Sequence, residues 1–258
     1  MKRGAALALV LMLAACSGTS ASGSSSTTLT VFAAASLQDA FEAIASAYEQ
    51  ETGVELALSF DASSALRMQI SEGADVDLFA SADRSKPQQL SEDGETEGDP
   101  VPFAGNGLAI VAPADGSGIQ SWQALGEPGT QVVAAGEDAP ITAYAAELID
   151  ALSTQADAPE GYEAAYEENI VSREDNVRAV LAKIEVGEGE GAVVYETDAA
   201  SSEDVIAVEY PPEANVVAEY AYVIVKGADP ATRAFAEWLT GPDGQAILEQ
   251  FGFRPADT

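Results

Sequence analysis

Short apolar runs alternate along the chain with segments whose apolar residues recur at helical spacing. Residues 37–51, for example, carry Phe41, Ile44 and Tyr48 on one helical face, and Gly53 ends that segment. The pattern predicts strands at 29–35, 54–60, 77–82, 107–112, 130–135, 191–195 and 218–225. It predicts helices at 37–51, 84–90, 140–152, 175–186, 230–239 and 245–251, with a short helix after Ser63 that ends at Gly73. This β-α alternation favours an α/β fold with helices on both faces of mainly parallel sheets, and the elements suffice for two lobes.

The first residues have the pattern of an export signal. Lys2 and Arg3 precede an apolar stretch at 5–13 that is too short to span a bilayer. Leu13-Ala14-Ala15-Cys16 follows and resembles a bacterial lipoprotein cleavage site, which predicts a signal peptide at 1–15 and lipid attachment at Cys16. The alternative is a plain secretory signal followed by an incidental cysteine. Residues 16–28 are rich in Ser, Gly and Thr and predict a flexible tether.

Composition excludes several classes of function. The formal net charge is −32, which repels nucleic acid, and the chain has no histidine, so His-based triads and His metal ligands are absent. With the single cysteine, Cys16, assigned to lipid attachment, no disulfide is expected. The acidic run at 91–99 has the composition of a cation site, but we interpret it as a solvated loop that helps to keep an exported protein soluble.

Motifs of common enzymes are missing or misplaced. The chain contains no G-x-S-x-G elbow, no serine with lysine three residues later, and no P-loop. Residues 187–192 fit a loose dinucleotide fingerprint, but they lie between a helix and a following strand, the reverse of the required order. We therefore expect binding and not catalysis.

Three predicted helix starts offer hydrogen-bond donors to an anion. Ser36 and Ser63 each follow a strand and precede a helix, and we predict Ser36 at an N-cap; Asp175-Asn176-Val177 opens a third helix. Helix starts present free N–H groups and a partial positive charge, and strand ends in open α/β sheets are the usual ligand sites. Each serine taken alone is more often an ordinary helix cap. Several such starts in one chain favour a site for an oxyanion held without Lys or Arg.

These segments resemble one known family, the periplasmic molybdate-binding proteins of ABC importers. The resemblance covers nearly the whole mature chain and rests on VFAAASL at 31–37, SFDASS at 59–64, QISEGA at 69–74, DLFASAD at 77–83, EDNVR at 174–178, GAVVY at 191–195 and FGF at 251–253.

The resemblance implies a type II periplasmic-binding-protein fold that closes over its ligand. One lobe would comprise 29–108 and 218–258, and the other 109–217. It implies that molybdate or tungstate, two ions of nearly equal size and charge, is bound by Ser36, Ser63, Ile141, Val177 and Tyr195. The segment around Ile141 lacks the glycine that the family pattern has, so Thr142 is an alternative donor. No cofactor and no direct metal ligand is implied. The expected protein is an extracytoplasmic, lipid-anchored monomer that delivers its ligand to an ABC permease.

Two other hypotheses remain open from the sequence. Within the binding class, the solute could be sulfate, phosphate or ferric iron, and iron-binding relatives use paired tyrosines such as Tyr220 and Tyr222. Their spacing places both on one strand face, which is also typical of a core row. A secreted hydrolase with a serine nucleophile is the alternative from another class, and the missing histidine argues against it.

Overall fold

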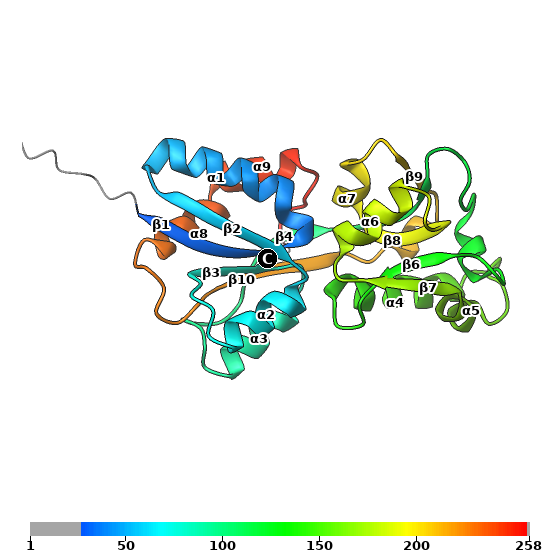
Figure 1. Cartoon of the computed structure of the whole chain (residues 1–258), viewed down its shortest axis with the longest axis horizontal. Helices are drawn as coiled ribbons and strands as arrows, with labels where there is room; N and C mark the ends of the chain where they lie inside the picture. The colour runs from blue at the N-terminus through cyan, green and yellow to red at the C-terminus, as the bar shows by residue number, and fades with distance from the viewer. Residues whose placement is uncertain (1–26, 257–258) are drawn as a thin grey trace, which may run out of the picture.

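The computed structural model describes residues 27–256, which form two α/β lobes lying side by side (Figure 1). Each lobe is built on a five-stranded sheet with helices on both faces, so the predicted fold class is confirmed. The leader and Cys16 lie outside the described residues. Within residues 27–256, no helix combines the length and the apolar character that crossing a membrane requires.

The first lobe contains the sheet β2-β1-β3-β10-β4. β1 pairs in parallel with β2 and β3, whereas β10 runs antiparallel to β3 and β4. Helices α1, α8 and α9 cover one face and α2 and α3 the other (Figure 1). The bounds are β1 Thr28–Ala34, the 3-10 turn η1 Ala35–Leu37, α1 Gln38–Thr52, β2 Glu55–Asp61, α2 Ser63–Ser71, β3 Leu78–Ser81, α3 Ser85–Glu92, β4 Val101–Asn106, β10 Ala218–Ile224, α8 Thr232–Thr240 and α9 Pro242–Gln250.

The second lobe repeats this plan with the sheet β7-β6-β8-β5-β9. β6 is parallel to β7 and β8, and β5 is antiparallel to β8 and β9. Helices α4 and α5 lie on one face and α6 and α7 on the other (Figure 1). The bounds are β5 Leu108–Pro113, η2 Trp122–Gly126, β6 Val132–Ala135, α4 Pro140–Ser153, α5 Tyr162–Asn169, β7 Ile170–Glu174, α6 Val177–Glu185, β8 Gly191–Tyr195, α7 Glu196–Ala200, β9 Val205–Val208 and η3 Pro212–Ala214.

The chain crosses between the lobes at two places. The first crossing is the single residue Gly107, between β4 and β5, and the second is the segment 209–217, between β9 and β10. A Cβ atom at position 107 would lie 2.3 Å from Cδ of Glu196, so a larger residue there would displace the end of that side chain. The backbone N–H of Glu196 donates to the carbonyl of Gly107 at 2.9 Å, which holds the start of α7 against the crossing.

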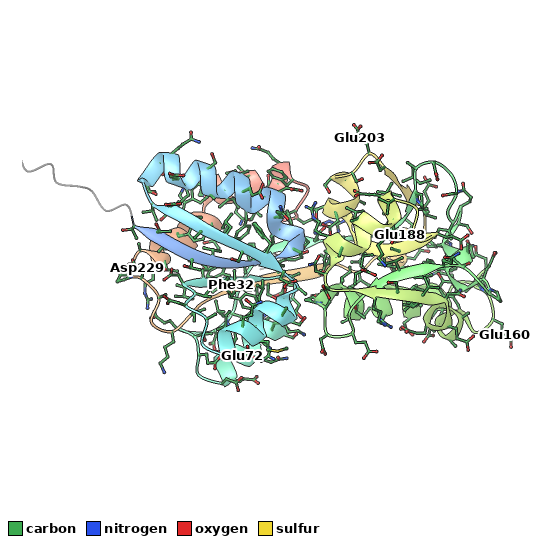
Figure 2. The ribbon with its side chains drawn as sticks, viewed as in Figure 1. Phe32, Glu72, Glu160, Glu188, Glu203 and Asp229 are labelled. Atoms are coloured by element: carbon green, nitrogen blue, oxygen red, sulfur yellow. The ribbon has the colours of Figure 1, made fainter. Side chains whose placement is uncertain are left out.

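The sheets are buried on both faces, as helix-covered parallel sheets require. On β1, Leu29, Val31 and Ala33 of one face are fully buried, and Phe32 and Ala34 of the opposite face are at most 9% exposed. Figure 2 shows Phe32 inside the first lobe, whereas Glu72, Glu160 and Glu203 project from the edges of the molecule. The excess negative charge is therefore carried largely by exposed side chains.

Five strands and α-helices were not predicted from the sequence, namely β4, α5, β7, α7 and β9, and neither were the 3-10 turns η2 and η3. The predicted strand at 191–195 has the observed bounds, and most other predicted elements are shifted by one to three residues. The acidic run at 91–99 begins with the last two residues of α3 and continues into the loop that follows. Within this loop Thr96 forms an antiparallel β-bridge with Val225.

Candidate functional site

The carboxyl ends of six strands, three from each lobe, supply the residues of one cavity. β1, β2 and β3 lead to Ser36, Ser63 and Ala82 in the first lobe. β6, β7 and β8 lead to the segment 139–141, to Val177 and to Tyr195 in the second lobe. Parallel strands in open α/β sheets present their ligand sites at this edge, and here the two edges face each other.

The cavity brings together all five residues singled out from the sequence: Ser36, Ser63, Ile141, Val177 and Tyr195. Its volume is ≈ 20 Å³, and each of the five is at most 5% exposed. A cavity this small suits a compact ligand. Thr142, the alternative donor, instead hydrogen-bonds to the carbonyls of Ala135 and Gly136 and does not line the cavity.

Alanines precede three of the four helix starts that meet there. Ala34, Ala62 and Ala139 are the residues before η1, α2 and α4, and none of them caps its helix with a side-chain hydrogen bond. The prediction that Ser36 is an N-cap is wrong, because Ser36 lies within η1. Alanine is a poor N-cap, so N–H groups of the first turns remain free of side-chain partners and can donate to a ligand.

The fourth start is capped by Asn176, whose Oδ1 accepts from the backbone N–H of Ala179 at 3.1 Å at the beginning of α6. Its Nδ2 donates across the cleft to Oδ1 of Asp61 at 3.2 Å, and the same oxygen accepts from the N–H of Ala62 at 2.7 Å. Asp61 thus joins the first lobe to the second. It is the only carboxylate among the cavity-lining residues, and its Oδ1 is held by two donors.

The hydroxyl of Ser63 has a defined direction. Its Oγ accepts from the backbone N–H of Ala82 at 3.0 Å, and a backbone N–H can only donate. The serine proton is therefore free to point into the cavity. Ser63 is 1% exposed, so this donor is shielded from competing water.

Ser36 is held by Tyr220 and, through it, by Asn106, two residues that the sequence did not connect with this serine. Its Oγ lies 2.8 Å from the hydroxyl of Tyr220 on β10, and Nδ2 of Asn106 on β4 donates to that hydroxyl at 3.3 Å. Asn106 Nδ2 also donates to Oγ1 of Thr197 at 2.8 Å. The tyrosine is fully buried and sits edge-on to Tyr195, with ring centroids 5.6 Å apart.

Tyr195 ends β8 with a hydroxyl that lacks a partner among the described residues. Burial raises the pKa of Tyr195 well above 10, and the nearby groups Tyr220, Tyr144, Asp198 and Asp83 raise it further. The phenol therefore stays protonated and remains a donor. A buried polar group without a partner costs free energy, which a ligand oxygen that accepts from it would recover.

An ion pair links the lobes beside the cavity. The Arg178 guanidinium on α6 pairs with Asp39 on α1 and lies 3.0 Å, from Nε to Oδ1, from Asp198 on α7. The side chain of Asp198 is fully buried, whereas that of Arg178 is 25% exposed. A wider hollow of ≈ 460 Å³ is lined by Asp39, Arg178 and Ser36 among others, so the bridge borders the same cleft.

The site has the chemistry of an anion receptor without a formal positive charge at its surface. No Lys or Arg lines the cavity. In residues 27–256, no cluster of three or more His, Cys, Asp or Glu side chains has the geometry to hold a metal ion. Two lobes that enclose a small donor-lined cavity between strand ends define a solute-binding protein of the type II periplasmic-binding-protein class.

Comparison with known proteins identifies the family. A family model described as bacterial extracellular solute-binding protein matches residues 29–254. The molybdate-binding protein ModA of Mycobacterium tuberculosis is 35% identical over 230 residues, which is 87% of this chain and 84% of that protein. The putative ABC transporter substrate-binding lipoprotein YvgL of Bacillus subtilis is 34% identical over 257 residues, or 96% and 95% of the two chains.

The fold comparison agrees with this. The periplasmic molybdate-binding protein of Azotobacter vinelandii superposes with a TM-score of 0.75 at 20% identity, over 89% of this chain and 100% of that chain. The chain therefore belongs to the bacterial extracellular solute-binding proteins. The resemblance predicted from the sequence is confirmed.

Proposed function

We propose that this protein captures molybdate or tungstate outside the cytoplasm and delivers it to an ABC transporter permease. The observation that carries the proposal is the composition of the cavity: two serines and a tyrosine beside four helix starts, with no Lys or Arg. Neutral donors of this kind bind a fully deprotonated oxyanion. Relatives at 34–35% identity include a protein named for molybdate binding and another named for ABC transport, which supports the same ligand and pathway.

Calorimetric titration of the purified protein with sodium molybdate tests this proposal. We expect saturable binding of one ion per chain. An absence of binding across the accessible concentration range contradicts the proposal.

The protein is proposed to act as a monomer by equilibrium capture, without catalysis and without a cofactor. The hydrolase alternative has no support in the cavity, since the chain has no histidine and Oγ of Ser63 already accepts from a backbone N–H. The iron alternative also loses support. Tyr220 is engaged by Ser36 and Asn106, and the ring of Tyr222 packs against Phe103.

We further propose that Cys16 carries a lipid that holds the protein at the outer face of the cell membrane. The signal pattern at 1–15 and the name of the lipoprotein relative support this. Replacement of Cys16 by Ser is expected to move the protein from the membrane fraction to the soluble fraction, since the acylated thiol is removed. Fractionation and immunoblotting measure the change.

Ser17→Ala is the matched control, because it alters the neighbouring residue and keeps the thiol. It should stay with the membranes. Retention of the Cys16→Ser variant at the level of this control would exclude Cys16 as the anchor.

A further inference from the structure

The hydrogen bond between Ser36 and Tyr220 determines what Ser36 can offer to a ligand. Their hydroxyl oxygens lie 2.8 Å apart, and either hydroxyl can be the donor. If Ser36 donates to Tyr220, it presents only lone pairs to the cavity, which repel an anion. If Tyr220 donates, the Ser36 proton is free for the ligand.

Asn106 selects the second arrangement. Its Nδ2 group, which can only donate, lies 3.3 Å from the Tyr220 hydroxyl oxygen and 2.8 Å from Oγ1 of Thr197. The Tyr220 oxygen therefore accepts from Asn106, and the Tyr220 proton is available for Oγ of Ser36. Tyr220 and Asn106 are fully buried and Ser36 is 3% exposed, so water does not compete in this chain of hydrogen bonds.

From this geometry we propose that Tyr220 and Asn106 are specificity-determining residues that hold Ser36 as a hydrogen-bond donor and so disfavour anions that carry an O–H group. The inference rests on the proposed function and adds two positioning residues to it. Ser63 independently supports the idea of serines held as donors. The backbone N–H of Ala82 donates to its Oγ and so leaves the Ser63 proton free for the ligand. A protonated oxyanion would bring its own proton against an O–H donor and leave that proton without an acceptor.

The test compares Kd values for molybdate and for hydrogen phosphate in the wild type and in Tyr220→Phe. Loss of the phenol frees the Ser36 hydroxyl to rotate and to accept from the O–H of hydrogen phosphate. We expect molybdate affinity to fall several-fold and the ratio of phosphate Kd to molybdate Kd to fall roughly tenfold, the effect of about one hydrogen bond to a charged group. Thermal unfolding of each variant verifies the fold.

Two controls separate orientation from general damage. Tyr222→Phe alters a second buried tyrosine of β10, which packs against the same Phe103, and it should keep the wild-type ratio. In a Ser36→Ala background, Tyr220→Phe should no longer change the ratio, since the oriented hydroxyl is gone. A ratio that falls equally with and without Ser36 would refute the proposal.

Asn106→Asp provides a second variant of nearly the same shape. A carboxylate accepts and does not donate, so it draws the Tyr220 proton away and reverses the chain. We expect molybdate to bind more weakly than in Tyr220→Phe. In the Tyr220→Phe background the added aspartate acts through its charge alone. The additional loss of molybdate affinity that Asn106→Asp causes when Tyr220 is present therefore measures the relay, by which we mean the hydrogen-bond chain from Asn106 through Tyr220 to Ser36.

The outcomes distinguish the two levels of the account. If the wild type binds molybdate and Tyr220→Phe keeps the wild-type ratio, the relay is refuted and the proposed function stands. If Asn106→Asp weakens molybdate binding equally with and without the Tyr220 hydroxyl, the opposite assignment of the amide oxygen and nitrogen holds and the proposed hydrogen-bond chain is refuted. If the wild type does not bind molybdate, the proposed function itself fails.

Discussion

Replacement of both Ser36 and Ser63 by alanine is expected to weaken molybdate binding about a hundredfold or more. Each hydrogen bond to a charged group contributes about 1.5–3 kcal/mol, which is roughly tenfold or more in affinity for each serine. The two hydroxyls come from different strand ends and have different partners, so their effects should be nearly additive. Calorimetric titration of the single and double variants measures the losses.

The fold should survive these substitutions. Neither serine caps its helix through a side-chain hydrogen bond, since Ala34 and Ala62 occupy the positions before η1 and α2. Ser64→Ala is the matched control, one residue along α2 and outside the cavity lining, and should bind as the wild type does. If the double variant bound molybdate with wild-type affinity, neither serine hydroxyl would be a ligand of the ion.

Replacement of Arg178 by Met is expected to lower the free energy of unfolding by about 1.4 kcal/mol more at pH 8 than at pH 5, because a buried carboxylate that has lost its partner keeps its proton above the normal folded pKa. That carboxylate is Asp198, whose side chain is fully buried. Burial raises the pKa of Asp198 to about 7, and the Arg178 guanidinium opposes the rise. Denaturant unfolding across a pH series measures the deficit.

The sign of the pH dependence follows from that pKa. The pKa of an unfolded aspartate is about 3.9. Because the pKa of folded Asp198 is about 7, the folded protein holds this proton more tightly than the unfolded chain. Stability therefore declines as the pH rises from about 4 through 7, by up to about 1.4 kcal/mol per pH unit for this group. Without Arg178 the folded pKa rises further. The deficit of Arg178→Met should be small at pH 5, where folded Asp198 is protonated, and should grow toward pH 8.

Two comparisons check this assignment. Arg233→Met breaks an ion pair with Glu97 in which the arginine side chain is 68% exposed, and such pairs contribute about 1 kcal/mol or less. Asp198→Asn in the Arg178→Met background should abolish the pH dependence of the deficit. A deficit that is the same at pH 5 and pH 8 would mean that Asp198 is not its source.

The elements that the sequence predicted best are those with strong apolar patterns. GAVVY of β8 is buried throughout and has the predicted bounds. The missed strands have weak patterns for physical reasons. β4 contains Pro102 and Gly105, which usually argue against a strand, and it lies at a sheet edge with a register shift opposite Tyr220/Ala221. β9 lies at the edge of the second sheet with its two central residues exposed.

The site was predictable where neighbouring residues create it. Ser36 and Ser63 each sit at a strand-to-helix junction, a local signal that sequence carries. Tyr220 is separated from Ser36 by 184 residues and from Asn106 by 114, so only the pairing of β10 within the first sheet brings them together. The alternation of Tyr220 and Tyr222 along one strand face predicted a core position, and Tyr220 is indeed fully buried. The role of its hydroxyl depends on partners that no local pattern reveals.

The strong negative charge and the proposed anionic ligand are compatible because the donors are local. The formal net charge is −32, yet the cavity is lined by backbone N–H groups and hydroxyls that are shielded from solvent. Hydrogen bonds within such a cavity are little affected by ionic strength, whereas the field of exposed carboxylates is screened within about 8 Å at physiological salt. Added salt should therefore change the affinity only slightly.

Competition among molybdate, tungstate, sulfate and phosphate in parallel titrations tests the central claim most directly. The O–H and N–H donors of the cavity offer no acceptor to hydrogen phosphate, and Oδ1 of its one lining carboxylate, Asp61, is already held by two donors. An unpaired O–H in a closed cleft costs about 1–3 kcal/mol. Sulfate is fully deprotonated but smaller, so fixed donors cannot all reach it. We expect molybdate and tungstate to bind alike, sulfate much more weakly and phosphate most weakly. Displacement of molybdate by phosphate at comparable concentration would show that an acceptor such as Asp61 serves the ligand, and it would contradict the account.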